Sequence, residues 1–388
     1  MDLVLARYTV AASLARLADE GARVAVLLHV LAVGRGAAFG GLLVAALMVP
    51  HVLVAPAVGA LADRVRHRRL LYVSGLAGYA VCLLGAALCV RDLPVLAFVL
   101  AVVAGCCAPL QIGGLTSLLG EIAPGRLPRA FGLDVASYSV AGIAGPAVAA
   151  LVAGWTAPIW SVVVLSGSGL VAAALVATLR LGTAPPHDGR RGGAVRAIVR
   201  RPALAAVTTA ATLAAFGQGA LPIVAALLAE DHADPPLTGF ALSAMAVGSL
   251  VSSLLYARLP VRRWAPEHVA LVAMTVVALP FAVLVFAGGR WATLGFFAAA
   301  GLLTGPALAL IMVVRDREAP AGVRTQVFTI AAGLKVTAAA AGVAVAGLVT
   351  AQGAVVLLLA VAACHLAAGT AGAVILRGQE PDRRSRNA

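Results

Sequence analysis

The chain has 388 residues, of which 62% are hydrophobic and 12% are charged, and its mean hydropathy is +1.00. A soluble protein carries roughly twice that share of charged residues, so the composition excludes a soluble globular protein and predicts an all-α polytopic membrane protein. The formal net charge of +13 would suggest a nucleic-acid partner in a soluble protein, but none is expected here because membrane topology explains the positions of the arginines.

Long apolar runs recur along the whole chain and are separated by short charged breaks. A helix needs about 20 mostly apolar residues to cross the hydrocarbon core of a bilayer. The runs therefore predict twelve transmembrane helices, at residues 4–33, 38–61, 70–90, 93–120, 132–155, 158–180, 203–229, 239–258, 268–287, 291–314, 326–349 and 353–376.

The first expected helix carries four charged residues, Arg16, Asp19, Glu20 and Arg23. Their spacing of i, i+3, i+4 and i+7 places them on one stripe of the helix, where the arginines can pair with the acids. The stripe sums to zero charge but is costly against lipid, so we expect it to face a wet cavity or the bundle interior. It is our first candidate for a substrate or proton-coupling site. The alternatives are an interfacial amphipathic helix and a permanent structural ion-pair cluster.

The second expected helix ends in the sequence GALADRVRHRRLL, residues 59–71. A small residue at Gly59 lets two helices approach closely. An aspartate at a helix end, here Asp63, can accept hydrogen bonds from the backbone N–H groups at the start of a neighbouring helix. The arginines can anchor the loop at an anionic membrane surface. The candidate gating residues are Gly59, Leu61, Asp63, Arg64, Arg68 and Arg69.

This stretch resembles the signature of the major facilitator superfamily between helices two and three, which reads roughly G-x-L-a-D-R-x-G-R-R. Within the superfamily, the chain looks most like the drug and macrolide efflux branch. The resemblance implies alternating access by two six-helix bundles and a gating role for the loop. Two features depart from the family: Arg66 replaces a glycine, and residues 98–107 lack the arginine that often pairs with the loop aspartate. The other interpretation is that the charges only set topology.

The fourth and fifth expected helices carry weaker candidates. Gln111 and Tyr138 can hydrogen-bond a ligand or another helix. The sequence SVAGIAGPAVAALVAG at 139–154 partly matches the G-x-x-x-G-P-x-x-G-G pattern of antiporters in this superfamily. Small residues allow close packing and proline can bend a helix, so the pattern is consistent with efflux and equally with packing alone. The residues of this candidate packing motif are Gly142, Gly145 and Pro146.

The longest break divides the expected helices into two groups of six. It is rich in Gly, Pro and Arg. We expect an N-terminal six-helix bundle at 1–180, a cytoplasmic linker at 181–201, a C-terminal six-helix bundle at 202–377 and a cytoplasmic tail at 378–388. The similar short sequences AGCCAP and AGLLTGP in the two halves are consistent with the parallel repeats of some transporters.

Two polar residues of the second half, Gln218 and Lys335, lie near the middle of expected helices. Gln218 can hydrogen-bond a ligand or another helix. Lys335 is the only lysine in the chain, and a buried lysine can release its proton where an arginine cannot. Its role is left open between a structural pair, a neutral amine and a state-dependent partner of the acids in the first helix.

The arginines orient the expected helices. With the N-terminus inside, the outer breaks contain only Arg35, Arg91 and Arg290, whereas the inner breaks and the tail contain most of the others. The positive-inside rule then places both termini in the cytoplasm. Heavy use of Arg, Ala, Gly and Val favours a GC-rich bacterial genome, and hence a multi-pass protein of the bacterial plasma membrane.

These patterns predict a secondary active transporter and not an enzyme. We expect proton-coupled efflux of hydrophobic or cationic small molecules; the alternative is import or uniport of a small metabolite. A membrane-embedded enzyme would need clustered His, Asp or Ser residues, and an ATP-driven pump a G-x-x-x-x-G-K-[ST] sequence; the sequence contains neither. The loops are too short to hold a partner domain, as a scaffold would need. The expected partners of a monomer are its substrate, protons and membrane lipids, with no cofactor and no metal.

Overall fold

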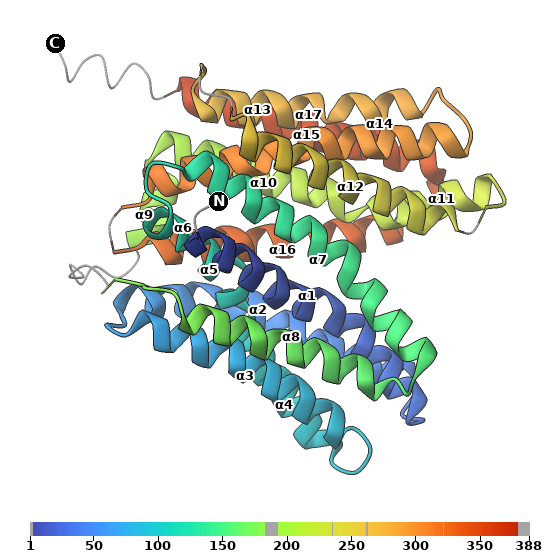
Figure 1. Ribbon diagram of the computed structural model, residues 1–388. Helices are drawn as coiled ribbons and strands as arrows, with labels where there is room; N and C mark the ends of the chain where they lie inside the picture. Colours follow the sequence, from blue (N-terminus) through green and yellow to red (C-terminus); the bar gives the residue numbers. More distant parts are fainter. Residues whose placement is uncertain (1–2, 183–192, 235, 261–262, 321, 379–388) are drawn as a thin grey trace. The chain divides into compact units, whose positions relative to one another are not determined.

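The secondary structure of the described residues is helical (Figure 1). The computed structural model describes residues 3–182, 193–234, 236–260, 263–320 and 322–378. Most of the expected linker, residues 183–192, and nearly all of the expected tail, residues 379–388, lie outside the described residues.

Eleven helical segments among the described residues are long and apolar enough to cross a membrane. Together they correspond to the second to twelfth expected helices. The first expected helix is α1 (Leu3–Ala32), which has 30 residues and is long enough to span a bilayer. Its charged stripe sets it apart from the other eleven, so its assignment as a twelfth span stays a prediction.

The chain forms two compact units. The first contains Met1–Gly125, Ser137–Gly189 and Ala321–Gly333, and the second contains Arg126–Ala136, Arg190–Pro320 and Leu334–Ala388. The bundles expected at 1–180 and 202–377 differ from these units at two helices, whose first turns group with the opposite unit. These helices are α7 (Leu127–Trp155) and α16 (Arg324–Leu348).

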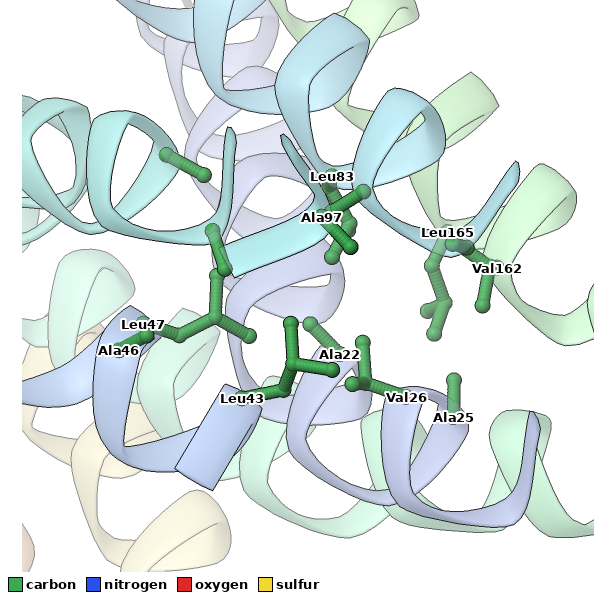
Figure 2. Close-up of a cluster of buried hydrophobic side chains, with 14 of the residues drawn as sticks. Ala22, Ala25, Val26, Leu43, Ala46, Leu47, Leu83, Ala97, Val162 and Leu165 are labelled. Atoms are coloured by element: carbon green, nitrogen blue, oxygen red, sulfur yellow. The ribbon is translucent and has the colours of Figure 1, made fainter. Parts of the chain in front are cut away.

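The first unit is built on contacts between neighbouring helices and on contacts of α8 with helices far from it in sequence. Its remaining elements are α2 (Ala37–Arg64), α3 (Arg68–Cys89), α4 (Pro94–Pro109), the π-helix η1 (Leu110–Gly114), α5 (Leu115–Ser117), α6 (Leu119–Ile122) and α8 (Ile159–Ala177). Helix α1 packs on α8 and α2, and α3 packs on α8 and α4. Small residues of α1, such as Ala22 and Ala25, meet Leu43, Leu83 and Leu165 in one apolar core (Figure 2). Small side chains at such contacts let the helices approach closely.

The second unit has its own apolar core. Its remaining elements are α9 (Gly193–Arg200), α10 (Pro202–Gly219), α11 (Leu221–Asp231), α12 (Leu237–Arg258), α13 (Pro266–Val276), α14 (Ala278–Leu284), α15 (Arg290–Glu318), the 3-10 helix η2 (Thr350–Gln352) and α17 (Gly353–Arg377). Helix α12 packs on α15, and α10 packs on α17. The rings of Phe281 and Phe297 meet edge to face, with their centroids 5.7 Å apart, near Leu357.

Topology is tested by labelling single cysteines from each side of the membrane. In a background with Cys82, Cys89, Cys106, Cys107 and Cys364 replaced, we expect His187→Cys to react only from the cytoplasmic side and Ala233→Cys only from the outside. The reason is the concentration of arginine in the breaks assigned to the cytoplasm. Reaction of both from one side of intact cells and inverted vesicles would contradict the topology.

Candidate functional site

The charged stripe of α1 lies inside the first unit. Arg16 is 1% exposed and Asp19 is 8% exposed, whereas Glu20 and Arg23 are half-buried. Charged groups inside a membrane protein are costly unless they pair or face water. The structure gives these residues polar partners on other helices of the same unit, and it therefore brings together the residues that the sequence singles out in α1.

Arg23 is shared between two carboxylates. Its Nη2 lies 3.0 Å from Asp19 Oδ2 and its Nη1 lies 2.9 Å from Glu20 Oε2. The hydroxyl of Tyr79, from α3, donates to Asp19 Oδ1 at 3.2 Å. Both oxygens of Asp19 therefore accept hydrogen bonds, and one guanidinium compensates two negative charges. Such charge-assisted bonds are stronger than neutral ones.

Arg16 joins α1 to two other elements. Its Nη2 donates to Thr116 Oγ1 at 2.9 Å, and its Nη1 donates to the hydroxyl of Ser137 in α7. Its Cζ lies 3.6 Å from the centroid of the Tyr138 ring, which is a cation–π contact. The expected candidate Tyr138 thus lies against the α1 cluster.

The element that carries Thr116 follows a π-helical segment. In η1, each backbone bond closes one residue later than in an α-helix, and such segments often occur at functional sites. This segment contains Gln111, which is 1% exposed. Among the described residues, the Gln111 side-chain Nε2 has no hydrogen-bond partner. Because η1 packs on α1, α2 and α3, Gln111 is a buried, unsatisfied amide in the same unit as the cluster.

The two glycines of the candidate packing motif in α7, Gly142 and Gly145, differ in their surroundings. A Cβ added at Gly145 would lie 2.8 Å from the backbone nitrogen of Gly21 and 3.1 Å from Glu20 Cβ, so α7 meets α1 beside the charged cluster. A Cβ added at Gly142 would meet no atom of the described residues within 4 Å. Pro146 lies inside α7. Close packing therefore explains Gly145 but not Gly142.

This contrast gives a matched pair of variants. Gly145→Ala is expected to destabilise the protein by about 1–3 kcal/mol, because the backbone of α1 must move to admit the methyl group. Gly142→Ala adds the same group in open space, where alanine favours a helix by about 1 kcal/mol over glycine. Thermal unfolding in detergent should separate the two, with only Gly145→Ala melting below the wild type. Equal melting temperatures would show that this α1–α7 contact adapts freely.

The loop motif forms a contact with the start of α16. Asp63 is 6% exposed; its Oδ1 accepts from the Thr325 backbone N–H at 2.9 Å, and its Oδ2 from the Gln326 N–H at 2.8 Å. A Cβ added at Gly59 would overlap Thr329 and crowd Gln326. Asp63 thus accepts hydrogen bonds from the start of a neighbouring helix, as the sequence predicts for an aspartate at a helix end. The contacted segment of α16 belongs to the same unit. The gating role of Asp63 stays a prediction.

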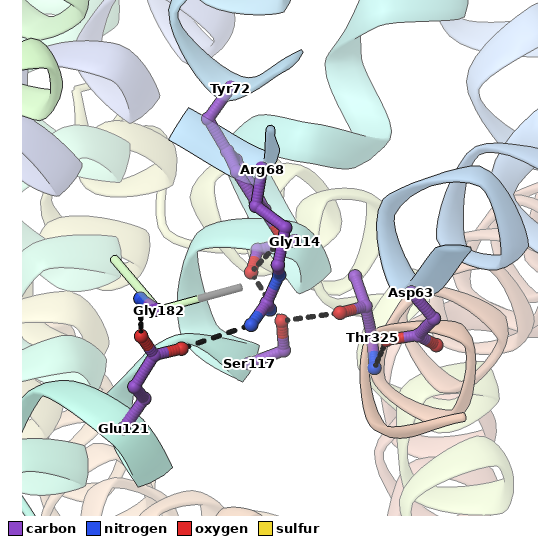
Figure 3. A network of polar contacts seen from close by, with 8 residues as sticks. All are labelled: Asp63, Arg68, Tyr72, Gly114, Ser117, Glu121, Gly182 and Thr325. Carbon is purple, nitrogen blue, oxygen red and sulfur yellow. Dashed lines mark hydrogen bonds and ion pairs between the residues drawn. The ribbon is translucent and has the colours of Figure 1, made fainter. Parts of the chain in front are cut away.

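The Asp63 contact is part of a group of polar contacts that also includes residues of α3 and of the segment 114–121 (Figure 3). The Ser117 hydroxyl donates to Gly114 O at 2.6 Å and lies 3.1 Å from the Thr325 hydroxyl, and the Tyr72 hydroxyl donates to the same Gly114 carbonyl at 3.1 Å. Arg68 Nη1 lies 2.9 Å from Glu121 Oε2.

Glu121 also accepts from the backbone N–H of Gly182. The polar contacts of Figure 3 therefore involve five segments of this unit: the end of α2, the start of α3, residues 114–121, Gly182 and the start of α16.

The other expected site residues are placed differently. Leu61, Arg64 and Arg69 are exposed. Gln218 and Lys335 are half-buried and belong to the second unit, so contact of Lys335 with the α1 acids stays a prediction. No group of three or more His, Cys, Asp or Glu side chains in the described ranges is arranged to hold a metal ion.

Several partners were not foreseen from the sequence. Tyr79, Thr116 and Ser137 complete the α1 cluster, and Thr325 completes the Asp63 contact. Hydroxyl residues are common inside membrane helices, so no spacing rule distinguishes these from the others. Their proximity depends on the tertiary fold.

A chain with eleven apolar spans, and charged and polar groups collected inside a helical unit, has the architecture of a multi-pass membrane transporter. The sequence pattern of the Major Facilitator Superfamily matches residues 8–217, which is more than half of the chain. The protein belongs to the major facilitator superfamily. It is a transporter and not an enzyme, and members of this superfamily bind small-molecule substrates.

One relative and two solved structures illustrate the likeness. The uncharacterized MFS-type transporter y4rN of Sinorhizobium fredii (strain NBRC 101917 / NGR234) is 26% identical over 353 residues, which cover 87% of this chain and 86% of the relative. The E. coli fucose:proton symporter FucP has a TM-score of 0.75 at 14% identity, covering 96% of this chain and 98% of FucP. A bacterial homologue of the iron transporter ferroportin in an outward-facing state has a TM-score of 0.73 at 18% identity, covering 96% and 99%. The two structures establish the fold alone.

Proposed function

We propose that the protein is a proton-coupled secondary transporter of the bacterial plasma membrane that exports hydrophobic or cationic small molecules. The observation that carries the proposal is the buried cluster in which Asp19 and Glu20 share Arg23 and Asp19 also binds Tyr79. An ionisable cluster at that position in an apolar helix is costly to keep, which supports a functional role.

The cluster offers a physical basis for exchange. Arg23 contacts both carboxylates, and the four charged side chains of the stripe, with Arg16 included, sum to zero formal charge. A proton or a cationic substrate adds one positive charge to this neutral stripe, and both together would leave two excess positive charges at low dielectric. Competition between proton and cation for one site is the thermodynamic requirement for antiport, since each weakens binding of the other.

The surroundings of the cluster favour a permissive ligand. The core beside it is mostly Ala, Val and Leu side chains, and a sugar would need many more fixed donors and acceptors than this core offers. Gln111, with its unsatisfied amide, and Tyr138 are the candidates for orienting a ligand. Import or uniport of a small metabolite is the alternative, and it would need a polar site elsewhere.

Alternating access would involve the Asp63 contact. Asp63 fixes the first turn of α16, while residues 334–348 of the same helix belong to the second unit. A helix divided between two units is suited to respond when they change their arrangement. We propose that release of Asp63 from the start of α16 accompanies opening on that side.

Transport in inverted membrane vesicles tests the function. An imposed pH gradient, acidic inside the vesicle, should drive uptake of a lipophilic cation such as ethidium, and a protonophore should abolish it. Vesicles without the protein are the control. Uptake that persists in the presence of the protonophore would contradict proton coupling. Transport of only sugars or other polar metabolites would favour import or uniport of a small metabolite.

A further inference from the structure

A strongly basic cavity lies in the first unit, at the end where α2 finishes and α3 starts. Its volume is about 790 Å³. The basic residues that line it are Arg66, His67, Arg68, Arg69 and Arg180. No carboxylate of the described residues lines the cavity, and the first turn of α3 adds the positive end of a helix dipole.

The charge of this cavity is compensated only in part. Glu121 pairs with Arg68 at 2.9 Å and is the carboxylate that the structure places at this group of arginines. The Arg68 side chain is 11% exposed, yet its Nε–H has no acceptor among the described residues. Arg66, Arg69 and Arg180 are exposed. No ion pair joins these three exposed arginines to a carboxylate of the described residues, so the cavity keeps an excess of positive charge that an anion would offset.

One wall of the cavity is apolar. Leu70, Val73 and Ala177 line it, and Leu70 is 67% exposed. Val81 and Leu88 of α3 are 60% and 63% exposed. Positions 70, 81 and 88 fall on one face of a helix at about 100° per residue. Exposed apolar side chains therefore recur along this face of α3 beyond the basic cavity, with the exposed Ser74 between Leu70 and Val81.

We propose that this cavity binds the headgroup of an anionic phospholipid. The phosphate would accept from the exposed guanidinium groups of Arg66 and Arg180, while an acyl chain would follow the apolar face of α3. Arginine pairs well with phosphate because its planar guanidinium donates two parallel hydrogen bonds. Basic pockets between membrane helices are a known type of site for such headgroups. A free phosphate ion would leave the apolar face unused.

The second unit contains a cavity whose charge can be compared with that of the basic cavity in the first unit. This cavity of about 340 Å³ is also formed where helices end, between the start of α13 and the end of α17. There Arg317 pairs with Glu267 and Glu318, each at 3.0 Å, and Arg377 supplies the second positive charge. Among the lining residues, two arginines face two glutamates, and Arg201 also lies 3.8 Å from Glu318. The two glutamates offset most of this positive charge, so this cavity should have a weaker preference for an anionic headgroup than the first.

Lipid binding to the purified full-length protein tests the proposal without a transport assay. The delipidated protein in neutral detergent is titrated with short-chain phosphatidylglycerol, phosphatidylcholine or inorganic phosphate, and binding is followed by native mass spectrometry and thermal shift. Phosphatidylglycerol should bind at least about tenfold more tightly than phosphatidylcholine. At about a fivefold loss per arginine, Arg180→Gln should weaken it about fivefold and Arg66→Gln with Arg180→Gln about 30-fold.

Two further variants separate charge from fold. Arg377→Gln, at the end of the last helix of the second unit, removes a matched arginine and should leave the affinity unchanged. Arg180→Lys keeps the charge and should lose less affinity than Arg180→Gln, which also guards against a folding defect in the glutamine variant. Equal affinity for the two lipids, an equal effect of Arg377→Gln, or inorganic phosphate binding as tightly as phosphatidylglycerol would each overturn the proposal.

Discussion

Asp63→Asn is expected to lower the transport rate at least about tenfold while leaving membrane insertion intact. The carboxylate accepts from two backbone N–H groups at the start of α16. An asparagine side chain has one acceptor oxygen and would turn its NH₂ group toward the other N–H donor. A hydrogen bond to a charged group contributes about 1.5–3 kcal/mol, so losing one changes an equilibrium by roughly ten- to hundredfold.

A surface aspartate supplies the control for this experiment. Asp92 is exposed in the break between α3 and α4, so Asp92→Asn removes the same charge without the contact to α16. Transport of a lipophilic cation in vesicles, normalised to the amount of protein in the membrane, should fall only in Asp63→Asn. Wild-type rates in both variants would leave the motif with a topological role alone.

Asp19→Asn is expected to abolish transport driven by a pH gradient while substrate binding persists. The variant removes one of the two carboxylates that share Arg23, so the stripe carries one positive formal charge before any proton or cation binds. The amide cannot bind and release a proton, so proton binding at this position no longer competes with cation binding. Tyr79→Phe removes only the hydrogen bond to Asp19 Oδ1 and should cost about fivefold at most, since one such bond contributes about 1 kcal/mol.

Two measurements on each variant separate coupling from binding. Gradient-driven uptake in vesicles reports coupling, and equilibrium binding of the same cation to purified protein reports the site. Glu20→Gln is the matched comparison, because it also leaves Arg23 with one carboxylate. Gradient-driven transport that survives in Asp19→Asn but not in Glu20→Gln would move the coupling role to Glu20. Survival in both would make the cluster structural.

The helices of this protein could be predicted closely, because a bilayer requires uninterrupted helices with long apolar runs. The second span, expected at 38–61, is α2 (Ala37–Arg64). Local irregularities could not be predicted. The π-helix η1 and the break between α10 and α11 at Ala220 leave the apolar pattern unchanged, and their cause lies in how neighbouring helices pack.

The candidate site was predictable only in part. Helical spacing brings Arg23 to Asp19 and Glu20, since all three lie on one turn and a half of α1. The partners of Arg16 could not be foreseen, because Thr116 and Ser137 lie 100 and 121 residues away in sequence. The sequence motif also does not distinguish Gly142 from Gly145, whereas in the structure only Gly145 lies against another backbone.

The open space beside Gly142 has a practical consequence for spectroscopy. A reporter group needs an attachment point that tolerates added atoms and yet lies near the chemistry of interest. Gly142 meets no atom within 4 Å among the described residues, and one helical turn away Gly145 lies against Glu20. Gly142→Cys, carrying a nitroxide or a small fluorophore, would place a polarity-sensitive probe within one turn of the carboxylates without forcing α7 away from α1.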